Sequence, residues 1–324
     1  MLIDVPQHVS RRLNQECFCI TVDHANLRGA LANEVGDAQS IAALMAARPH
    51  LFSSTPVFLP AVEISEMLRT VRAIEAVAVL PAYRDAVLSW APESAGYDPG
   101  PLGIFMGYDF HLTDDGPKLI EINTNAGGAF LNALLVRAQR ACCEEVDTAL
   151  ARSGEQEFES AVIRMFENEW RLQGRPSRPR RIAIVDDRPE EQYLYPEFLL
   201  AQRLLGRHGF EAHVVDAGQL RYEASQLMVD GKPLDFVYNR LVDFALEGAG
   251  HTALRAAYLN AATVVTPHPR AHALFADKRN MTVLSDEGLL RSWGVLDETL
   301  TALRRIPRTI HVTAENAQQL WKIR

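Results

Sequence analysis

The stretch LIEINTNAGG (119–128) decides the fold, because it places a carboxylate and an amide in an apolar run and then adds two glycines. Glu121 and Asn123 lie two positions apart, so on a strand their side chains share one face, about 7 Å apart at the backbone. Both present oxygen atoms, which are the ligands that Mg²⁺ prefers. The spacing therefore predicts a magnesium site at Glu121 and Asn123 that a nucleotide's phosphates complete.

The same alternation predicts how the strand packs. Leu119 is expected on the face of Glu121, and Ile120 and Ile122 are expected to pack on the other. In an alternative interpretation Glu121 and Asn123 only face solvent on a half-exposed sheet, and NAGG is an ordinary turn.

The glycines lie between this strand and a helix. Glycine lets backbone amides approach a ligand closely, and a helix start adds donors that favour an anion. The run AFLNALLVRAQRACCEEVDTAL (129–150) repeats apolar residues on one face, which predicts that helix.

Upstream, the pattern changes from helices to a hairpin. In AVEISEMLRTVRAIEAVAVL apolar residues recur at three-and-four spacing, and Pro81 marks the end of the predicted helix. GIFMGYDFHL (103–112) and KLIEINT (118–124) are strand-like runs joined by TDDGP, whose Asp115-Gly116 step favours a tight turn.

Downstream of the cationic, proline-broken run RPSRPRR, strands alternate with helices. RIAIVDD, EAHVVD and TVVTP are predicted strands, and LMVDG and KPLDFVYNRL are predicted to pair as a second hairpin at Asp230-Gly231. This order predicts a mostly parallel, doubly wound α/β sheet, which binds ligands beyond the carboxyl ends of its strands. The candidate residues there are Asp186, Asp187, Arg188, Gln192, Arg240 and His268.

Each candidate also has a plain structural interpretation. The acids Asp186 and Asp187 can cap or solvate a strand end. Arg240 can bind a carboxylate or phosphate through its planar fork, or form an ordinary surface salt bridge. His268 and His272 are four apart without a glutamate between them, so a zinc site is not expected.

Composition narrows the class of protein. The chain has 324 residues, a formal net charge of −8 and no long basic stripe, which disfavours nucleic-acid binding. Its four cysteines match neither a zinc ribbon nor a redox motif and are expected to be small core residues. Neither a leader nor a membrane-spanning stretch is evident, so cytoplasmic residence is expected.

Together these elements resemble the ATP-grasp superfamily, and most closely its circularly permuted branch, typified by eukaryotic-type glutathione synthetase. The motifs that carry the resemblance are Y-D-F in the first strand, I-E-I-N-T, the two glycines, V-Y-N-R and A-D-K, between about residues 100 and 285.

The resemblance implies a role for each site residue. Glu121 and Asn123 would hold Mg²⁺, and Asp109 and Lys278 would contact ATP, with Lys278 on a helix. The remaining residues would bind the substrate, Arg240 also acting in catalysis: Asn125, Gly127, Gly128, Gln192 and Arg240. Three departures from the family pattern, Gly107, Asp186 and Asp243, argue against glutathione as the product.

The resemblance also implies an organisation. Residues 1–175 would form a helical region with an ATP-grasp-like sheet, 181–270 a Rossmann-like substrate-binding lobe, and 271–324 the start of an ATP-binding subdomain. The family's glycine-rich loop and second ATP lysine have no counterpart here, so a truncated chain is expected, with a homodimer or a missing C-terminal half completing it.

The implied function is an ATP- and magnesium-dependent carboxylate-amine ligase acting on a small acid and a small amine. One alternative is a non-catalytic ligand-binding or regulatory protein of the same fold. Another is a magnesium-dependent phosphate-ester hydrolase using Glu121, Asn123 and Asp109.

Overall fold

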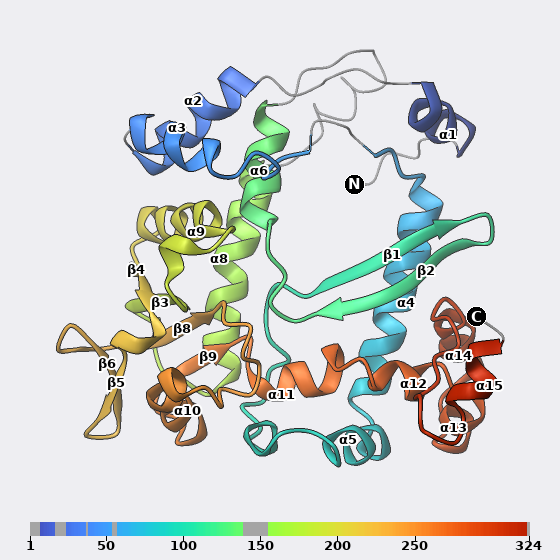
Figure 1. Cartoon of the computed structure of the whole chain (residues 1–324). Coiled ribbons are helices and arrows are strands. Elements are labelled where there is room, and N and C mark those ends of the chain that lie inside the picture. Colours follow the sequence, from blue (N-terminus) through green and yellow to red (C-terminus); the bar gives the residue numbers. More distant parts are fainter. Residues whose placement is uncertain (1–6, 17–23, 37, 54–56, 139–154, 323–324) are drawn as a thin grey trace.

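The chain folds into a mixed α/β structure (Figure 1), seen in a computed structural model that describes residues 7–16, 24–36, 38–53, 57–138 and 155–322. Five helices come first: α1 Gln7–Glu16, α2 His24–Val35, α3 Ala38–Ala46, α4 Ala61–Ala78 and α5 Pro81–Leu88. The predicted break at Pro81 is confirmed, since that proline starts α5. None of the helices in these ranges combines the length and apolar character needed to cross a bilayer.

The predicted hairpin is present as β1 Gly107–Thr113 and β2 Gly116–Asn123, which pair antiparallel. The register shifts after Asp109, which pairs with Glu121, because Phe110 pairs with Leu119 and leaves Ile120 as the extra residue of a β-bulge.

This bulge corrects the predicted faces of the strand. Leu119 and Ile122 are both buried in the same core, and Ile120 is 47% exposed. The extra residue breaks the two-residue period, so Leu119 packs on the face opposite Glu121 rather than beside it.

After the glycines the chain forms α6 Ala129–Ala138 and, further on, α8 Glu155–Leu172. The predicted helix over 129–150 is confirmed as far as Ala138. Its remainder lies outside the described residues, as do all four cysteines: Cys17, Cys19, Cys142 and Cys143.

The second region contains a four-stranded sheet made of β3 Arg181–Asp186, β4 Glu211–Asp216, β8 Phe236–Asn239 and β9 Val264–Thr266. The strand order is β4-β3-β8-β9 and every pair is parallel, as predicted. Helix α9 Tyr195–Arg207 connects β3 to β4, and α10 Thr252–Leu259 connects β8 to β9.

Both faces of this sheet are covered. One face packs against α6, α8 and α9 through Ile182, Ile184, Phe236, Tyr238 and Val264. The other packs against α10 and a small antiparallel sheet through Ala183, Val185, Val215, Val237 and Val265. Apolar residues at successive positions are what a strand buried on both faces requires.

The small sheet consists of β5 Arg221–Glu223, β6 Gln226–Val229 and β7 Lys232–Pro233. The predicted hairpin at Asp230-Gly231 is confirmed, because Val229 pairs with Lys232. The predicted single strand KPLDFVYNRL is wrong, since its first two residues join β6 and FVYN joins the parallel sheet.

The C-terminal part is helical: α11 Pro269–Ala271, the π-helical turn η5 His272–Ala276, α12 Asn280–Leu284, α13 Glu287–Ser292, α14 Asp297–Leu303 and α15 Ala317–Lys322. The predicted helix carrying Lys278 is interrupted at Asp277, whose backbone is extended (φ −61°, ψ 120°). Its carboxylate accepts hydrogen bonds from Arg279 N at 2.9 Å and Nε at 3.0 Å. Lys278 therefore lies in a turn.

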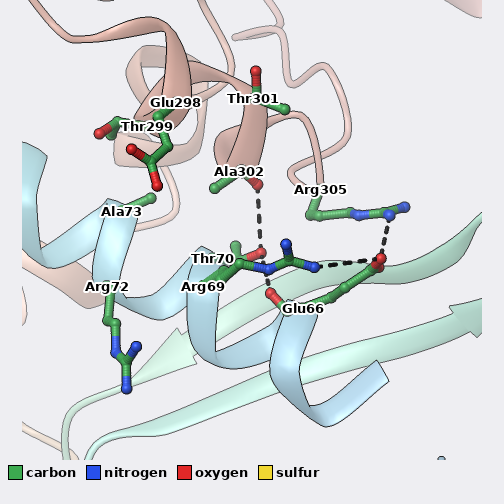
Figure 2. A pocket seen from close by; sticks show the side chains of 10 residues that line it. All are labelled: Glu66, Arg69, Thr70, Arg72, Ala73, Glu298, Thr299, Thr301, Ala302 and Arg305. Carbon is green, nitrogen blue, oxygen red and sulfur yellow. Dashed lines mark hydrogen bonds and ion pairs between the residues drawn. The ribbon is translucent and has the colours of Figure 1, made fainter. Parts of the chain in front are cut away.

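A cavity of about 540 Å³ lies between α4 and α14 (Figure 2). At its edge Arg305 Nη2 lies 2.6 Å from Glu66 Oε2, and Arg305 Nη1 donates to Asp115 O in the hairpin turn. Leu119 N donates to Arg305 O at 2.9 Å. The hairpin is thus fixed to the C-terminal helices near its turn, at the end away from Gly127 and Gly128.

A buried acid in α8 predicts a pH effect on stability. Glu169 is 3% exposed, and burial raises its pKa to about 7 against the smaller opposing effects of the nearby Thr266 and Gln173 side chains. Protonated Glu169 makes its full contribution to the stability of the fold below pH 4.5, the ordinary pKa of a glutamate. That contribution is lost as the pH rises through 7, because the buried side chain must then carry a charge.

Glu169→Gln is therefore expected to unfold like the wild type at pH 4.5 and to be about 2–3 kcal/mol more stable at pH 8. Urea denaturation at both pH values measures this, with the exposed Glu157→Gln on the same helix as control. Equal stability of variant and wild type at pH 8 would contradict it.

Candidate functional site

Three polar side chains meet on one face of the hairpin. Lys278 Nζ lies 2.9 Å from Glu121 Oε2, and Asn123 Nδ2 donates to Glu121 Oε1 at 3.2 Å. Asp109 pairs with Glu121 across the strands. The hydrogen bond from Lys278, and then that from Asn123, lower the pKa of Glu121, so its carboxylate is ionised at neutral pH.

Glu121, Asn123 and Lys278 line a cavity of about 370 Å³ at the carboxyl end of β2. Its lining also includes Phe244 and His272, whose rings stack with centroids 3.8 Å apart and planes 7° apart. The cavity is thus lined by both charged residues and an aromatic pair.

The donors on this face fit a magnesium ion chemically. Glu121 and Asp109 supply carboxylate oxygens, and Asn123 keeps its amide oxygen free while its nitrogen bonds Glu121. Mg²⁺ usually takes one or two carboxylates and completes its shell with water and phosphate oxygens. Among the described residues there is no cluster of three or more His, Cys, Asp or Glu side chains that could hold a metal ion.

Arg240 lies beside the glycine turn, residues 125–128, and is 5% exposed. Its Nη1 donates to Ala126 O at 3.2 Å and to Tyr238 Oη at 3.4 Å. Its Nε is buried without an acceptor among the described residues. An arginine beside the glycine turn that has a buried N–H without an acceptor can bind an anionic group by donating a hydrogen bond to it.

The backbone amides at the start of α6 are bonded by a glutamate whose role was not predicted from the sequence. Glu197 of α9, 0% exposed, accepts from Gly128 N at 3.0 Å, Phe130 N at 3.4 Å and Leu131 N at 3.1 Å. Burial raises the pKa of Glu197, and the amides and Arg240 offset part of that effect. The expectation that these amides hold a substrate anion is therefore not met in this structure, because an internal carboxylate takes that place.

The space beside Gly127 is also filled. A Cβ at Gly127 would lie 2.4 Å from Leu194 Cδ1 and 3.1 Å from Arg240 Nη2. The predicted room for a substrate at Gly127 is thus taken by Leu194 in this conformation.

Gly127→Ala is expected to lower the free energy of unfolding by about 1–3 kcal/mol, because the new methyl group overlaps Leu194. Adding Leu194→Ala should recover part of the loss by removing the overlapping group. Urea denaturation measures both, with Gly206→Ala in α9 as control, since a Cβ there meets nothing within 4 Å. No recovery in the double variant would contradict this explanation.

The remaining predicted residues lie around the same turn. Asn125 Nδ2 donates to Leu241 O at 3.3 Å, and Gln192 Nε2 donates to Asp187 O at 2.6 Å. The backbone of the Gln192 loop is held by Arg48, which donates to Glu190 O, Gln192 O and Tyr193 O at 2.8–3.2 Å. No local sequence pattern indicates this role of Arg48, because Arg48 lies more than 140 residues away from its acceptors.

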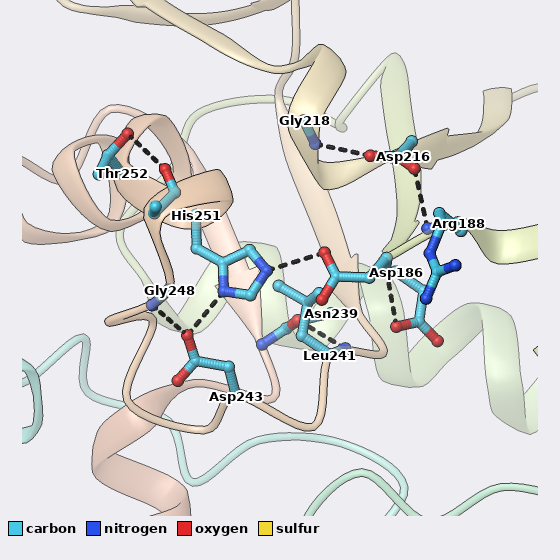
Figure 3. A network of polar contacts seen from close by, with 12 residues as sticks. Asp186, Arg188, Asp216, Gly218, Asn239, Leu241, Asp243, Gly248, His251 and Thr252 are labelled. Atoms are coloured by element: carbon cyan, nitrogen blue, oxygen red, sulfur yellow. Dashed lines mark hydrogen bonds and ion pairs between the residues drawn. The ribbon is translucent and has the colours of Figure 1, made fainter.

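The acids after β3 enter a network that Figure 3 shows. Asp186 is buried, which raises its pKa to about 6 against the opposing effects of the Asp187 amide and Arg240. Asp187 Oδ1 lies 2.9 Å from His251 Nε2. Arg188, in the left-handed region at φ 43°, forms an exposed ion pair with Glu191 at 2.7 Å. These acids are structural partners here rather than free strand caps.

His268 is not part of this arrangement. Its Nε2 lies 2.9 Å from Pro101 O, and its Nδ1 accepts from Ala271 N at 3.1 Å, which together require a neutral ring. Burial lowers its pKa to about 4. His268 therefore serves packing, and His272 contributes to the cavity wall.

No protein-family model matches the chain, and no curated protein matches it in sequence. A glutathione synthetase-like effector from Globodera pallida, solved in its apo form, has a similar structure, with a TM-score of 0.53 and 14% sequence identity. The match covers 88% of this chain and 71% of that one.

The chain has a glutathione synthetase-like fold.

At this identity the likeness concerns the fold alone. Within the glutathione synthetase-like fold of this chain, the hairpin end, the glycine turn and the carboxyl edge of the parallel sheet adjoin, since Arg240 bonds Ala126 and Asn125 bonds Leu241. The predicted metal residues Glu121 and Asn123 and three of the predicted substrate residues, Asn125, Gly127 and Gly128, lie in the segment 121–128, and Arg240 contacts this segment at Ala126.

Proposed function

We propose that this chain is an ATP- and magnesium-dependent carboxylate-amine ligase of the ATP-grasp type, similar to glutathione synthetase in its site. The observation that carries the proposal is the cavity of about 370 Å³ where Glu121, Asn123 and Lys278 lie together. A pair of oxygen ligands and an ammonium group beside one cavity suit a magnesium-bound triphosphate.

Each residue has a role in this proposal. Glu121 and Asn123 would hold Mg²⁺, with Asp109 beside them, and Lys278 would exchange its ion pair with Glu121 for a phosphate oxygen. Bound Mg²⁺ would neutralise charge on the phosphates. Arg240 would orient the acid through the donor that lacks an acceptor, beside Asn125 and the glycine turn.

The proposed reaction has two steps. A carboxylate oxygen of the acid attacks the γ-phosphorus of ATP, so that ADP leaves and an acylphosphate forms. The amine then attacks the acyl carbon, phosphate leaves, and the nitrogen loses a proton as the amide forms. This chain's contribution would be to position the reactants and to stabilise negative charge.

The acid must reach a region that Leu194 and Glu197 fill in this structure. Leu194 belongs to the loop that carries Gln192, so a shift of this loop would admit the substrate. Gln192 would then turn from Asp187 O, its acceptor here, toward the acid.

The test begins with binding. Mg²⁺ and ATP together are expected to raise the melting temperature, whereas ATP with EDTA is not. Phosphate release is then measured with a panel of small acids, with and without added amines. Release that requires an amine supports a ligase, and release in water alone would indicate a hydrolase.

No stabilisation by Mg²⁺ and ATP at millimolar concentration would overturn the nucleotide assignment. Stabilisation with no turnover for any acid and amine would instead support a ligand-binding protein of the same fold.

A further inference from the structure

A histidine with a carboxylate at each ring nitrogen lies at the carboxyl edge of the parallel sheet (Figure 3). His251, the last residue of the turn η4 Ala249–His251, is 5% exposed. Its Nδ1 lies 2.6 Å from Asp243 Oδ2, and its Nε2 lies 2.9 Å from Asp187 Oδ1. A neutral imidazole has one N–H and a carboxylate only accepts, so both contacts are hydrogen bonds only when the ring is an imidazolium.

The two carboxylates belong to different loops. Asp187 begins the loop 187–194, whose Gln192 side chain bonds Asp187 O. Asp243 begins the loop 243–248, whose Gly248 N donates to Asp243 Oδ2 at 2.7 Å and whose Phe244 lines the 370 Å³ cavity. A Cβ at Gly248 would lie 2.7 Å from His251 Nδ1, so only glycine fits there. One imidazolium therefore joins the loop beside the glycine turn to the loop beside the cavity.

We propose that His251 is a positioning residue which, as an imidazolium, holds loops 187–194 and 243–248 together and so sets the shape of the adjoining ligand cavity. The inference that nucleotide binding depends on this bridge rests on the proposed function, whereas the bridge itself does not. Charge-assisted hydrogen bonds at both nitrogens make the two loops move as one unit while the ring keeps its proton.

The charges around the ring determine how the bridge responds to pH. Asp187 and Asp186 face it from β3 and the following loop, and Asp243 faces it from the loop after β8. Asp216, at the start of the neighbouring turn η3 Ala217–Gln219, directs its carboxylate to Gly218 N and Arg188 N instead.

Burial disfavours the charged ring, but the hydrogen bonds to Asp187 and Asp243 outweigh it and raise the pKa of His251 above 6.5. The protonated ring, and with it the bridge, therefore predominates at pH 6.5 and is lost as the pH rises through the raised value. Burial raises the pKa of Asp186 to about 6, so Asp186 is mostly ionised above pH 7 and changes between pH 7 and 9 report mainly on His251.

The proton is tested directly by NMR of protein labelled with ¹⁵N-histidine, with His251→Gln used to assign the signal. At pH 6.5 both nitrogens of His251 are expected to carry protons, and Asp243→Asn is expected to lower the pH at which one is lost. A neutral His251 at pH 6.5 would overturn the proposal.

The coupling is tested by hydrogen exchange of 187–194 and 243–248, corrected for intrinsic rates, at pH 6.5 and 9. The wild type should lose protection in both loops together at pH 9, roughly tenfold for one charge-assisted hydrogen bond. His251→Gln should show that loss already at pH 6.5. The control is His213→Gln, which removes an exposed imidazole 3.1 Å from Glu211.

In the wild type, the affinity for Mg²⁺ and ATP should fall over the same pH range in which the two loops lose protection. In His251→Gln, the affinity should not depend on pH over this range. Protection unaffected by pH and by His251→Gln would overturn the bridge. If the wild type binds no nucleotide at any pH, the proposed function fails while the exchange result still decides the bridge. Should His251→Gln fail to fold, Asp187→Asn at the half-exposed carboxylate provides the same comparison.

Discussion

Replacing Arg240 with methionine is expected to lower the free energy of unfolding by about 3–5 kcal/mol, because it removes one partner from a buried set of charges. Arg240 is the cation that acts on the buried carboxyl groups of Glu197 and Asp186. Arg240→Lys keeps a cation there and is expected to cost less, although it loses the planar fork.

Urea denaturation measures the loss, and Arg203→Met, at an exposed arginine of α9, is the matched control that should change stability by less than about 0.5 kcal/mol. A double-variant cycle identifies the cause. In Glu197→Gln the side-chain oxygen still accepts hydrogen bonds from the amides of α6, but the side chain carries no charge. The double variant Arg240→Met/Glu197→Gln should therefore lose about 1–3 kcal/mol less stability than the sum of the losses in the two single variants. Strict additivity would show that Arg240 stabilises the fold independently of the charge on Glu197.

Glu121→Gln is expected to weaken magnesium-dependent nucleotide binding by roughly 100-fold or more, since it removes the carboxylate proposed as the principal ligand. Stability should hardly change, because the Lys278–Glu121 ion pair is exposed. The variant also frees Lys278, so residual ATP binding without Mg²⁺ is expected to persist or rise.

Calorimetric titration with ATP, with Mg²⁺ and with EDTA, separates these effects. Glu223→Gln on the exposed strand β5 is the control. An unchanged magnesium dependence in Glu121→Gln would remove the metal assignment, even if ATP still binds.

Local patterns predicted the elements but not the contacts between distant ones. The hairpin, the parallel strands and the break at Pro81 follow from turn residues, apolar runs and proline, which act over a few positions. The bulge at Ile120 was missed because a strict two-residue period cannot reveal an extra residue. Lys278 was placed on a helix because its neighbours are helix formers, and the side chain of Asp277 ends that helix locally.

The candidate site shows the same division. Glu121 and Asn123 could be selected from their spacing. The family resemblance selected Lys278, and only the structure shows that it contacts Glu121, 157 positions earlier in the chain. Glu197 and His251 gave no signal, because a capping acid and a bridging histidine become visible only when two loops meet. The roles assigned to all of these residues remain proposals that the experiments above decide.

Arg48 has a consequence for protein engineering. Its guanidinium holds three carbonyl groups of the loop that carries Gln192, although it follows α3 near the start of the chain. A chimaera that transplants only the segment containing the parallel sheet would leave this clamp behind. A graft intended to keep the loop in shape must therefore include α2 and α3, so the transplantable unit is discontinuous in sequence.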